Sequence, residues 1–173
     1  EWEGAYAFSK TWTLGGNLAL SQNKIREFTE YIDDYSVDEF RQETNTYTNT
    51  DIAFSPNVVG SAIIEYKPAK NLSINWLSKY VGRQFLDNTS NNSRSLDAFF
   101  TNDLRFSYAA TPRFFKGLEV NLLINNLFNE LYEPNGYTFS YFVPGGFGRE
   151  LVTENFYYPQ AGTNFLLGVK MKF

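Results

Sequence analysis

The chain has 173 residues, contains no cysteine or histidine, and carries a net charge of −4 at neutral pH. The lack of cysteine excludes disulfides and thiolate metal sites, and the lack of histidine removes the commonest general base and metal ligand. The negative charge argues against a nucleic-acid partner. No run of about 18 apolar residues is present, so the sequence predicts no helical membrane span.

The N-terminal residues alternate like a strand from the start. Trp2, Gly4, Tyr6 and Phe8 fall on one parity, and successive side chains of a strand point to opposite faces. These residues do not have the features of a signal peptide. We therefore expect the chain to begin within a structure, as a fragment of a longer protein does.

The same two-residue period recurs along the chain. Leu118, Val120 and Leu122, for example, alternate with Glu119 and Asn121. The pattern predicts seven strands, at about residues 1–9, 11–28, 51–66, 71–87, 98–110, 117–133 and 161–173. The fold class is therefore all-β.

The last strand has the clearest pattern. One parity is wholly apolar and consists of Phe165, Leu167, Val169, Met171 and Phe173. The other parity is mixed and includes Lys170 and Lys172. In water such an edge strand promotes aggregation. In a bilayer it forms the wall of a transmembrane barrel, which is apolar outside and polar inside.

The predicted connections alternate between short and long. The short ones lie near residues 9–11, 67–71 and 111–116, and the long ones at 29–50, 88–97 and 134–160. This asymmetry is typical of an antiparallel up-and-down barrel with short periplasmic turns and long extracellular loops. It places Phe173 at the periplasmic rim.

The odd number of strands leaves two interpretations. Bacterial single-chain barrels have an even number of antiparallel strands. Either a strand is hidden, with residues 134–143 as its place, or the chain is one arc of a larger barrel. A soluble antiparallel sandwich that acts as a binding module is the alternative fold. The 18-residue strand at 11–28 favours the barrel, because sandwich strands usually have about 5–6 residues.

A resemblance to a known family rests on residues 120–132, which read VNLLINNLFNELY. The NNLFN segment followed by Tyr132 resembles the NNLF(N/D)xxY segment in the penultimate barrel strand of TonB-dependent receptors. The strand that ends in Phe173 resembles their closing strand. Residues 80–89 and 94–100 are similar to the Bacteroidetes branch of the family. The likeness covers most of the chain from about residue 55.

This resemblance implies an outer-membrane barrel of 22 strands with an N-terminal plug in its lumen. Residues 1–173 are then the C-terminal part of the barrel domain, with its last seven or eight strands, and the plug is absent. Such receptors import a scarce ligand, such as a siderophore, cobalamin or a glycan, with energy from TonB. A complete small outer-membrane barrel with a structural or adhesive role is the alternative.

The same resemblance implies the partners and the location. The partners are outer-membrane lipid, the missing plug and remaining barrel strands, TonB through the plug, and the barrel-assembly machinery. A surface lipoprotein is an optional further partner. The location is the bacterial outer membrane. We expect no cofactor and no enzyme activity, because no nucleophile with a base and no acid–base carboxylate pair stands out.

The final long connection supplies the candidate ligand-binding residues, Tyr137, Tyr141, Phe142 and Phe147. Aromatic rings offer flat apolar area with polar tips, which suits sugars, catechols and macrocycles. The alternative is that Tyr137, Phe139 and Tyr141 extend strands and belong to the outer aromatic girdle.

Two further groups of residues have expected roles. The alternating face that ends at Phe173 (Phe165, Leu167, Val169, Met171) resembles the C-terminal signal for barrel assembly, and it also serves as a lipid-facing strand. The acidic residues of the first long connection are Glu30, Asp33, Asp34, Asp38 and Glu39. We expect these to form a solvated loop rather than a calcium site. Charged residues such as Glu119, Lys170 and Lys172 are expected to line the lumen and pair across strands.

Overall fold

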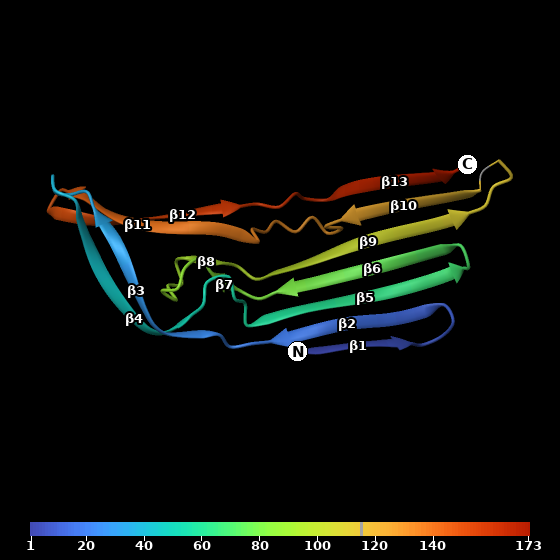
Figure 1. The fold of residues 1–173 in the computed structure, drawn as a ribbon, viewed down its shortest axis with the longest axis horizontal. Helices are drawn as coiled ribbons and strands as arrows, with labels where there is room; N and C mark the ends of the chain where they lie inside the picture. The colour runs from blue at the N-terminus through green and yellow to red at the C-terminus, as the bar shows by residue number, and fades with distance from the viewer. Residues whose placement is uncertain (115) are drawn as a thin grey trace.

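The computed structural model describes residues 1–114 and 116–173, and within them seven strands form one antiparallel sheet (Figure 1). The strands are β1 (Trp2–Ala7), β2 (Trp12–Leu20), β5 (Val58–Ala69), β6 (Leu72–Val81), β9 (Phe99–Ala110), β10 (Gly117–Asn125) and β13 (Asn164–Lys172). They pair in the order β1-β2-β5-β6-β9-β10-β13. Each of the seven predicted strands has one counterpart in this sheet, which confirms the all-β antiparallel fold.

The register of the sheet gathers apolar residues of neighbouring strands on one face. One row crosses five strands through Ile64, Trp76, Leu104, Ile124 and Phe165. Because side chains alternate between the two faces of a strand, the residues directly before and after each member of this row point to the opposite face. The alternation predicted from the sequence is therefore continuous across the sheet.

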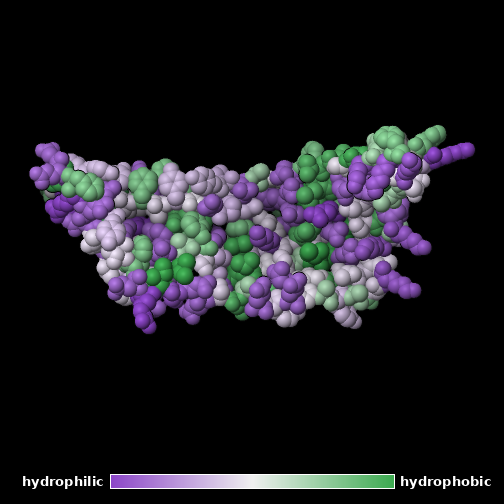
Figure 2. Space-filling view, in the orientation of Figure 1, coloured by the Kyte–Doolittle hydropathy of each residue, from purple (hydrophilic) through white to green (hydrophobic). Residues whose placement is uncertain are grey.

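The opposite face carries polar and charged side chains together with some apolar ones. Lys170 and Lys172 of β13 reach Glu119 of β10, with Nζ–Oε distances of 3.7 and 3.4 Å. These ion pairs join neighbouring strands as predicted. Figure 2 shows one face of the molecule, on which hydrophilic side chains surround separate hydrophobic patches.

Within the described residues the sheet is a single layer. A second sheet, of order β12-β11-β3-β4, continues beyond one end of the first and does not stack on it (Figure 1). The sandwich interpretation is therefore wrong, because the apolar face stays open and Phe165 is 78% exposed. The order of the first sheet ends at β1 and β13, so the barrel is not closed.

The connections at the two ends of the seven-stranded sheet differ as expected. The turns β1–β2, β5–β6 and β9–β10 lie at one end, where the chain also ends (Figure 1). The predicted turn at 111–116 includes residue 115, which lies outside the described residues. All the long connections lie at the other end, which confirms the up-and-down pattern.

The predicted strand at 11–28 is wrong as a single element, since β2 ends at Leu20 and β3 (Lys24–Asp34) begins four residues later. Between them, Ser21 N–H donates to the Asn57 carbonyl at 3.0 Å, and Asn23 accepts from Ile52 N–H at 3.2 Å. These bonds tie the break to the segment before β5 and let β3 leave the sheet. The unusual length of this strand therefore does not support the barrel, which rests on the register instead.

Both of the longest connections fold into hairpins. β3 pairs with β4 (Arg41–Asp51), where a loop was predicted, and β11 (Asn135–Gly145) pairs with β12 (Gly148–Tyr158). A strand thus exists at 134–143, but it joins the second sheet and leaves the first with seven strands. The threonine alternation of residues 44–50 is the β-branched pattern that the loop prediction overlooked.

Other strands also depart from their predicted limits, and β5 begins at Val58 instead of residue 51. β10 ends at Asn125, because Asn126 and Asn129 adopt positive φ angles of 49° and 55°, which asparagine tolerates better than most residues. β6 ends at Val81, and residues 82–98 form an irregular segment that contains the short pair β7 (Gln84–Phe85) and β8 (Ser95–Leu96).

A small core lies between the two sheets. The buried apolar side chains among the described residues are Ile32, Val81, Leu86, Leu96 and Phe99. They come from β3, the end of β6, the 82–98 segment and the start of β9. The core therefore fixes the long hairpins to the end of the seven-stranded sheet.

Candidate functional site

The two long hairpins meet through β3 and β11. Both strands run away from the seven-stranded sheet, so they pair in parallel. In the part of the chain that the structure describes, this pairing covers Tyr141 with Asp33 and Phe142 with Asp34. Tyr35 N–H also donates to the Phe142 carbonyl at 2.8 Å. We call this short contact the seam.

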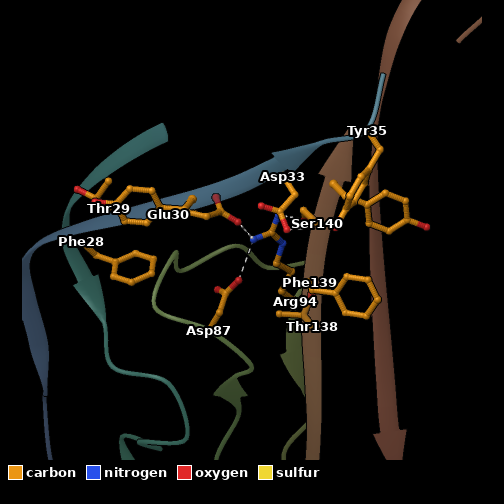
Figure 3. A pocket seen from close by; sticks show the side chains of 12 residues that line it. Phe28, Thr29, Glu30, Asp33, Tyr35, Asp87, Arg94, Thr138, Phe139 and Ser140 are labelled. Carbon is orange, nitrogen blue, oxygen red and sulfur yellow. Dashed lines mark hydrogen bonds and ion pairs between the residues drawn. The ribbon is translucent and has the colours of Figure 1, made fainter. Parts of the chain in front are cut away.

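Arg94 bridges β3 and β11 where the seam ends (Figure 3). Its Nη1 lies 2.6 Å from Oε1 of Glu30 in β3 and 2.8 Å from Oδ2 of Asp87. Its Nη2 donates to Ser140 Oγ in β11 at 2.6 Å. The Arg94 side chain is only 5% exposed. One buried cation therefore connects both hairpins to the 82–98 segment.

The surroundings keep Arg94 charged. Burial alone would lower its pKa, but the hydrogen bonds with Asp87 and Glu30 outweigh this effect and raise it. Tyr47 donates its hydroxyl to Glu30 Oε2 at 2.8 Å, and its own pKa is raised by burial and by this bond. Glu30 thus accepts hydrogen bonds from both Arg94 and Tyr47, and Asp87 accepts one from Arg94.

A second arginine secures the outer part of the seam. Arg149 Nη1 lies 3.0 Å from Asp34 Oδ2 and 2.7 Å from Glu43 Oε1. Its guanidinium also lies 4.2 Å from the centroid of the Phe142 ring, a cation–π contact. The Asp34 carboxylate is buried, and hydrogen bonds from Ser36 and then Arg149 lower its pKa despite that burial.

The prediction of a solvated acidic loop is wrong for Glu30 and Asp34. Glu30 is bonded to Arg94, and Asp34 is bonded to Arg149. Both lie in β3, and the arginines come from elsewhere, Arg94 from the 82–98 segment and Arg149 from β12. Among the described residues, no group of three or more acidic side chains is placed to hold a metal ion.

A cavity of about 500 Å³ opens where β3 and β11 diverge below the seam. Residues 28–31 form one wall and residues 138–141 the other, with Asp87 and Arg94 between them (Figure 3). Two buried polar atoms of these residues lack a hydrogen-bond partner, namely Arg94 Nε and Thr138 Oγ1.

Aromatic rings line the other face of β11. Tyr137 stacks on Phe156 of β12 with centroids 4.8 Å apart, and Phe139 lies 5.7 Å from Tyr141. Tyr35 adds an edge contact with Tyr141 at 6.1 Å. These rings are partly exposed. They form a row of apolar surface with phenolic hydroxyls on the side that faces away from Arg94.

The structure does not bring the four predicted ligand-binding residues together. Tyr137 and Tyr141 lie in the aromatic row, while Phe142 points to the opposite face and stacks under Arg149. Phe147 lies in the turn between β11 and β12 and is fully exposed. The four side chains therefore occupy three separate environments.

Sequence reasoning missed both arginines of the seam. Arg94 meets Ser140 and Glu30 across 46 and 64 residues of sequence, and Arg149 meets Asp34 across 115. No local spacing signals such contacts. In the sequence, Arg94 is a single arginine in a polar segment, and nothing else there indicates its role.

The residues of the predicted assembly signal share one exposed face of the final strand. Phe165, Leu167, Val169 and Met171 alternate along β13. Phe173 follows the strand and is also exposed. The arrangement suits contact with lipid and recognition of an alternating apolar edge alike.

The comparisons with known proteins found similarity in structure alone. No family model and no curated protein sequence matches the chain. The structure is similar to the ferric yersiniabactin uptake receptor FyuA from Yersinia pestis, with a TM-score of 0.59 and 12% identity over 99% of this chain and 22% of that chain. The likeness shows a shared fold. The seven-stranded sheet has the fold of part of that receptor's barrel.

A second similar structure is the closed form of the ferric-catecholate import receptor Fiu from E. coli K12. Its TM-score is 0.48, with 14% identity over 96% of this chain and 26% of that chain. The chain thus spans about a quarter, or less, of the length of either receptor.

Proposed function

We propose that the chain is the C-terminal part of the barrel of a TonB-dependent receptor in the bacterial outer membrane. The observation that carries the proposal is the continuous apolar face of a sheet that, among the described residues, no second layer covers. A bilayer gives such a face its hydrocarbon contact while the alternate residues line a wet lumen.

The remaining barrel strands, a plug and TonB would supply the rest of the transport machinery. The NNLFN segment, the closing strand and the fold shared with an uptake receptor support this assignment. The cargo is a scarce ligand such as a siderophore, cobalamin or a glycan. Residues 80–89 and 94–100 favour a receptor of the Bacteroidetes branch. The chain would have no catalytic role.

Individual residues take roles within this proposal. Tyr137 and Tyr141 offer ligand contacts on the exposed aromatic row. Phe142 and Phe147 lie elsewhere on the same hairpin and would contact only a larger ligand or a surface partner. The alternating residues of β13 would form both the lipid contact and the signal read by the assembly machinery.

Spin labels on adjacent residues of β10 test the membrane assignment. The chain has no native cysteine, so Leu122→Cys and Asn121→Cys give a matched pair on opposite faces. In the native protein in lipid, the label at 122 should collide with oxygen and not with a water-soluble nickel complex. The label at 121 should show the reverse. Equal accessibility to the nickel complex at both positions would overturn the proposal.

The mass of the native gene product tests the receptor assignment separately. A receptor requires a product several times the 19.9 kDa of this chain. A mature product close to 20 kDa, with the two-sided labelling pattern intact, would identify a small barrel instead.

A further inference from the structure

The edges of β3 and β11 that face each other are only partly paired. Tyr35 N–H donates across the seam to the Phe142 carbonyl. The backbone groups of a strand alternate in direction. The odd-numbered residues of β3 and the even-numbered residues of β11 therefore direct their backbone N–H and C=O groups toward the opposite strand.

The cavity continues the line of the seam. Below Asp33 and Tyr141 the two strands separate, and residues 28–31 and 138–141 become its walls. By the same alternation, the backbones of Thr29 and Tyr31 face those of Thr138 and Ser140 across the cavity. Both walls thus offer alternating donors and acceptors, as two neighbours of a missing strand do.

Buried side-chain atoms add a specific demand. Arg94 Nε carries a hydrogen without an acceptor, and Thr138 Oγ1 also lacks a partner. The carboxylates are already bonded, since Glu30 accepts from Arg94 and Tyr47. Asp87 accepts from Arg94 as well. The Arg94 Nε hydrogen therefore still needs a hydrogen-bond acceptor. A neutral acceptor such as a carbonyl oxygen suits a cavity that already contains several carboxylates.

Charge narrows the choice of ligand. The cavity is lined by three carboxylates, those of Glu30, Asp33 and Asp87, against the single cation of Arg94. An anionic ligand would add to this excess of negative charge and would be repelled. A neutral or basic ligand with alternating N–H and C=O groups fits both the walls and the charge.

We propose that the cavity between β3 and β11 binds a short extended peptide, which pairs with both strands and completes a five-stranded sheet. Strand addition to exposed edges is a recurrent mode of peptide recognition, in which main-chain hydrogen bonds supply the affinity. The volume of about 500 Å³ lies within the range of small-ligand sites and limits the peptide to a few residues. This site does not depend on the membrane role.

Backbone-modified peptides give the direct test. The probe is a pool of acetylated and amidated tetrapeptides built from alanine, threonine, tyrosine and lysine, added to the full-length native protein in detergent. Bound peptides are identified by mass spectrometry. Each is then remade with single N-methyl groups along the backbone, and its affinity is measured by calorimetry. Loss of one backbone hydrogen bond should weaken binding about tenfold.

A pair of proline variants tests the location. Thr138→Pro removes an N–H that faces the cavity, and Leu151→Pro removes one from the outer edge of β12, because Leu151 lies opposite Phe142 in the β11–β12 ladder. We expect Thr138→Pro to weaken peptide binding about tenfold and Leu151→Pro to leave it unchanged.

Three outcomes would overturn the proposal. They are the binding of no tetrapeptide, equal affinity of the N-methylated peptides, and equal effects of the two proline variants. The N-methyl series uses the unaltered protein, so it decides the matter even if Thr138→Pro perturbs folding. The labelling pattern of β10 is a separate readout, so failure here is distinguishable from failure of the membrane assignment.

Discussion

Replacing Arg94 should loosen the seam by an amount that its geometry sets. In Arg94→Met, the carboxylates of Glu30 and Asp87 lose the cation that lies 2.6 and 2.8 Å from them. Two unit charges about 5 Å apart repel by about 3 kcal/mol at an effective dielectric constant of about 20. Breaking a buried ion pair costs about 3–5 kcal/mol in other proteins. We therefore expect the seam to lose about 3 kcal/mol.

Hydrogen exchange of the native protein measures this loss locally. The amide of Tyr35, which donates across the seam, should exchange about 100-fold faster in Arg94→Met, while the β9–β10 amides stay protected. Adding Glu30→Gln and Asp87→Asn removes the repulsion and should restore most of the protection. Unchanged exchange in Arg94→Met, or no recovery in the triple variant, would refute the reasoning.

Three other outcomes follow from the described contacts. The Ser36 hydroxyl holds the pKa of Asp34 below its ordinary value, so the stability that Asp34 confers is complete above that value and is lost as pH falls through the lowered one. The distribution of distances between spin labels on the two hairpin tips should broaden only in acid. Broadening that begins near neutral pH would contradict this prediction. Val169→Arg should cost about 2–4 kcal/mol in folding titrations into lipid vesicles. Gly168→Arg should cost less, since its Cβ would meet its nearest neighbour at 3.9 Å, and equal penalties would show that the faces are misassigned. Gly136→Ala should destabilise β11 by about 1–3 kcal/mol because the new Cβ would lie 2.5 Å from a carbonyl oxygen of β12. Faster hydrogen exchange of the β11 amides, with unchanged exchange in β10, would confirm this local destabilisation.

The seven-stranded sheet was predictable because its signal is local and repeated. Each strand shows the two-residue period on its own, and the register only aligns what the sequence already displays, as in the row from Ile64 through Trp76 to Leu104. The limits of the strands were less predictable. Ser21 and Asn23, just after the end of β2, form hydrogen bonds with Asn57 and Ile52. The alternation of residues 11–28 contains no sign of these bonds.

The seam was not predictable because its signal is neither local nor periodic. In the sequence, Glu30 cannot be distinguished from an exposed acidic residue, because its partner Arg94 lies 64 positions away. Phe142 and Tyr141 are adjacent aromatic residues in the sequence, yet strand alternation sends one to Arg149 and the other to the aromatic row. Grouping them by residue type was therefore bound to mix two surfaces.

The two halves of the chain are stabilised by different physics. The seven-stranded sheet has no protein layer among the described residues to cover Phe165 or Leu167, and in the proposed receptor the hydrocarbon of the bilayer would cover this apolar face. The hairpins instead rest on a buried core that includes Ile32 and Leu96, and on the arginine clusters of the seam. Those interactions form in water and do not require lipid. If a bilayer covers the apolar face as proposed, removal of lipid should unfold the sheet before the hairpins. The seam should then stay closed as long as the β6–β9 connection keeps Arg94 in contact with Glu30 and Ser140.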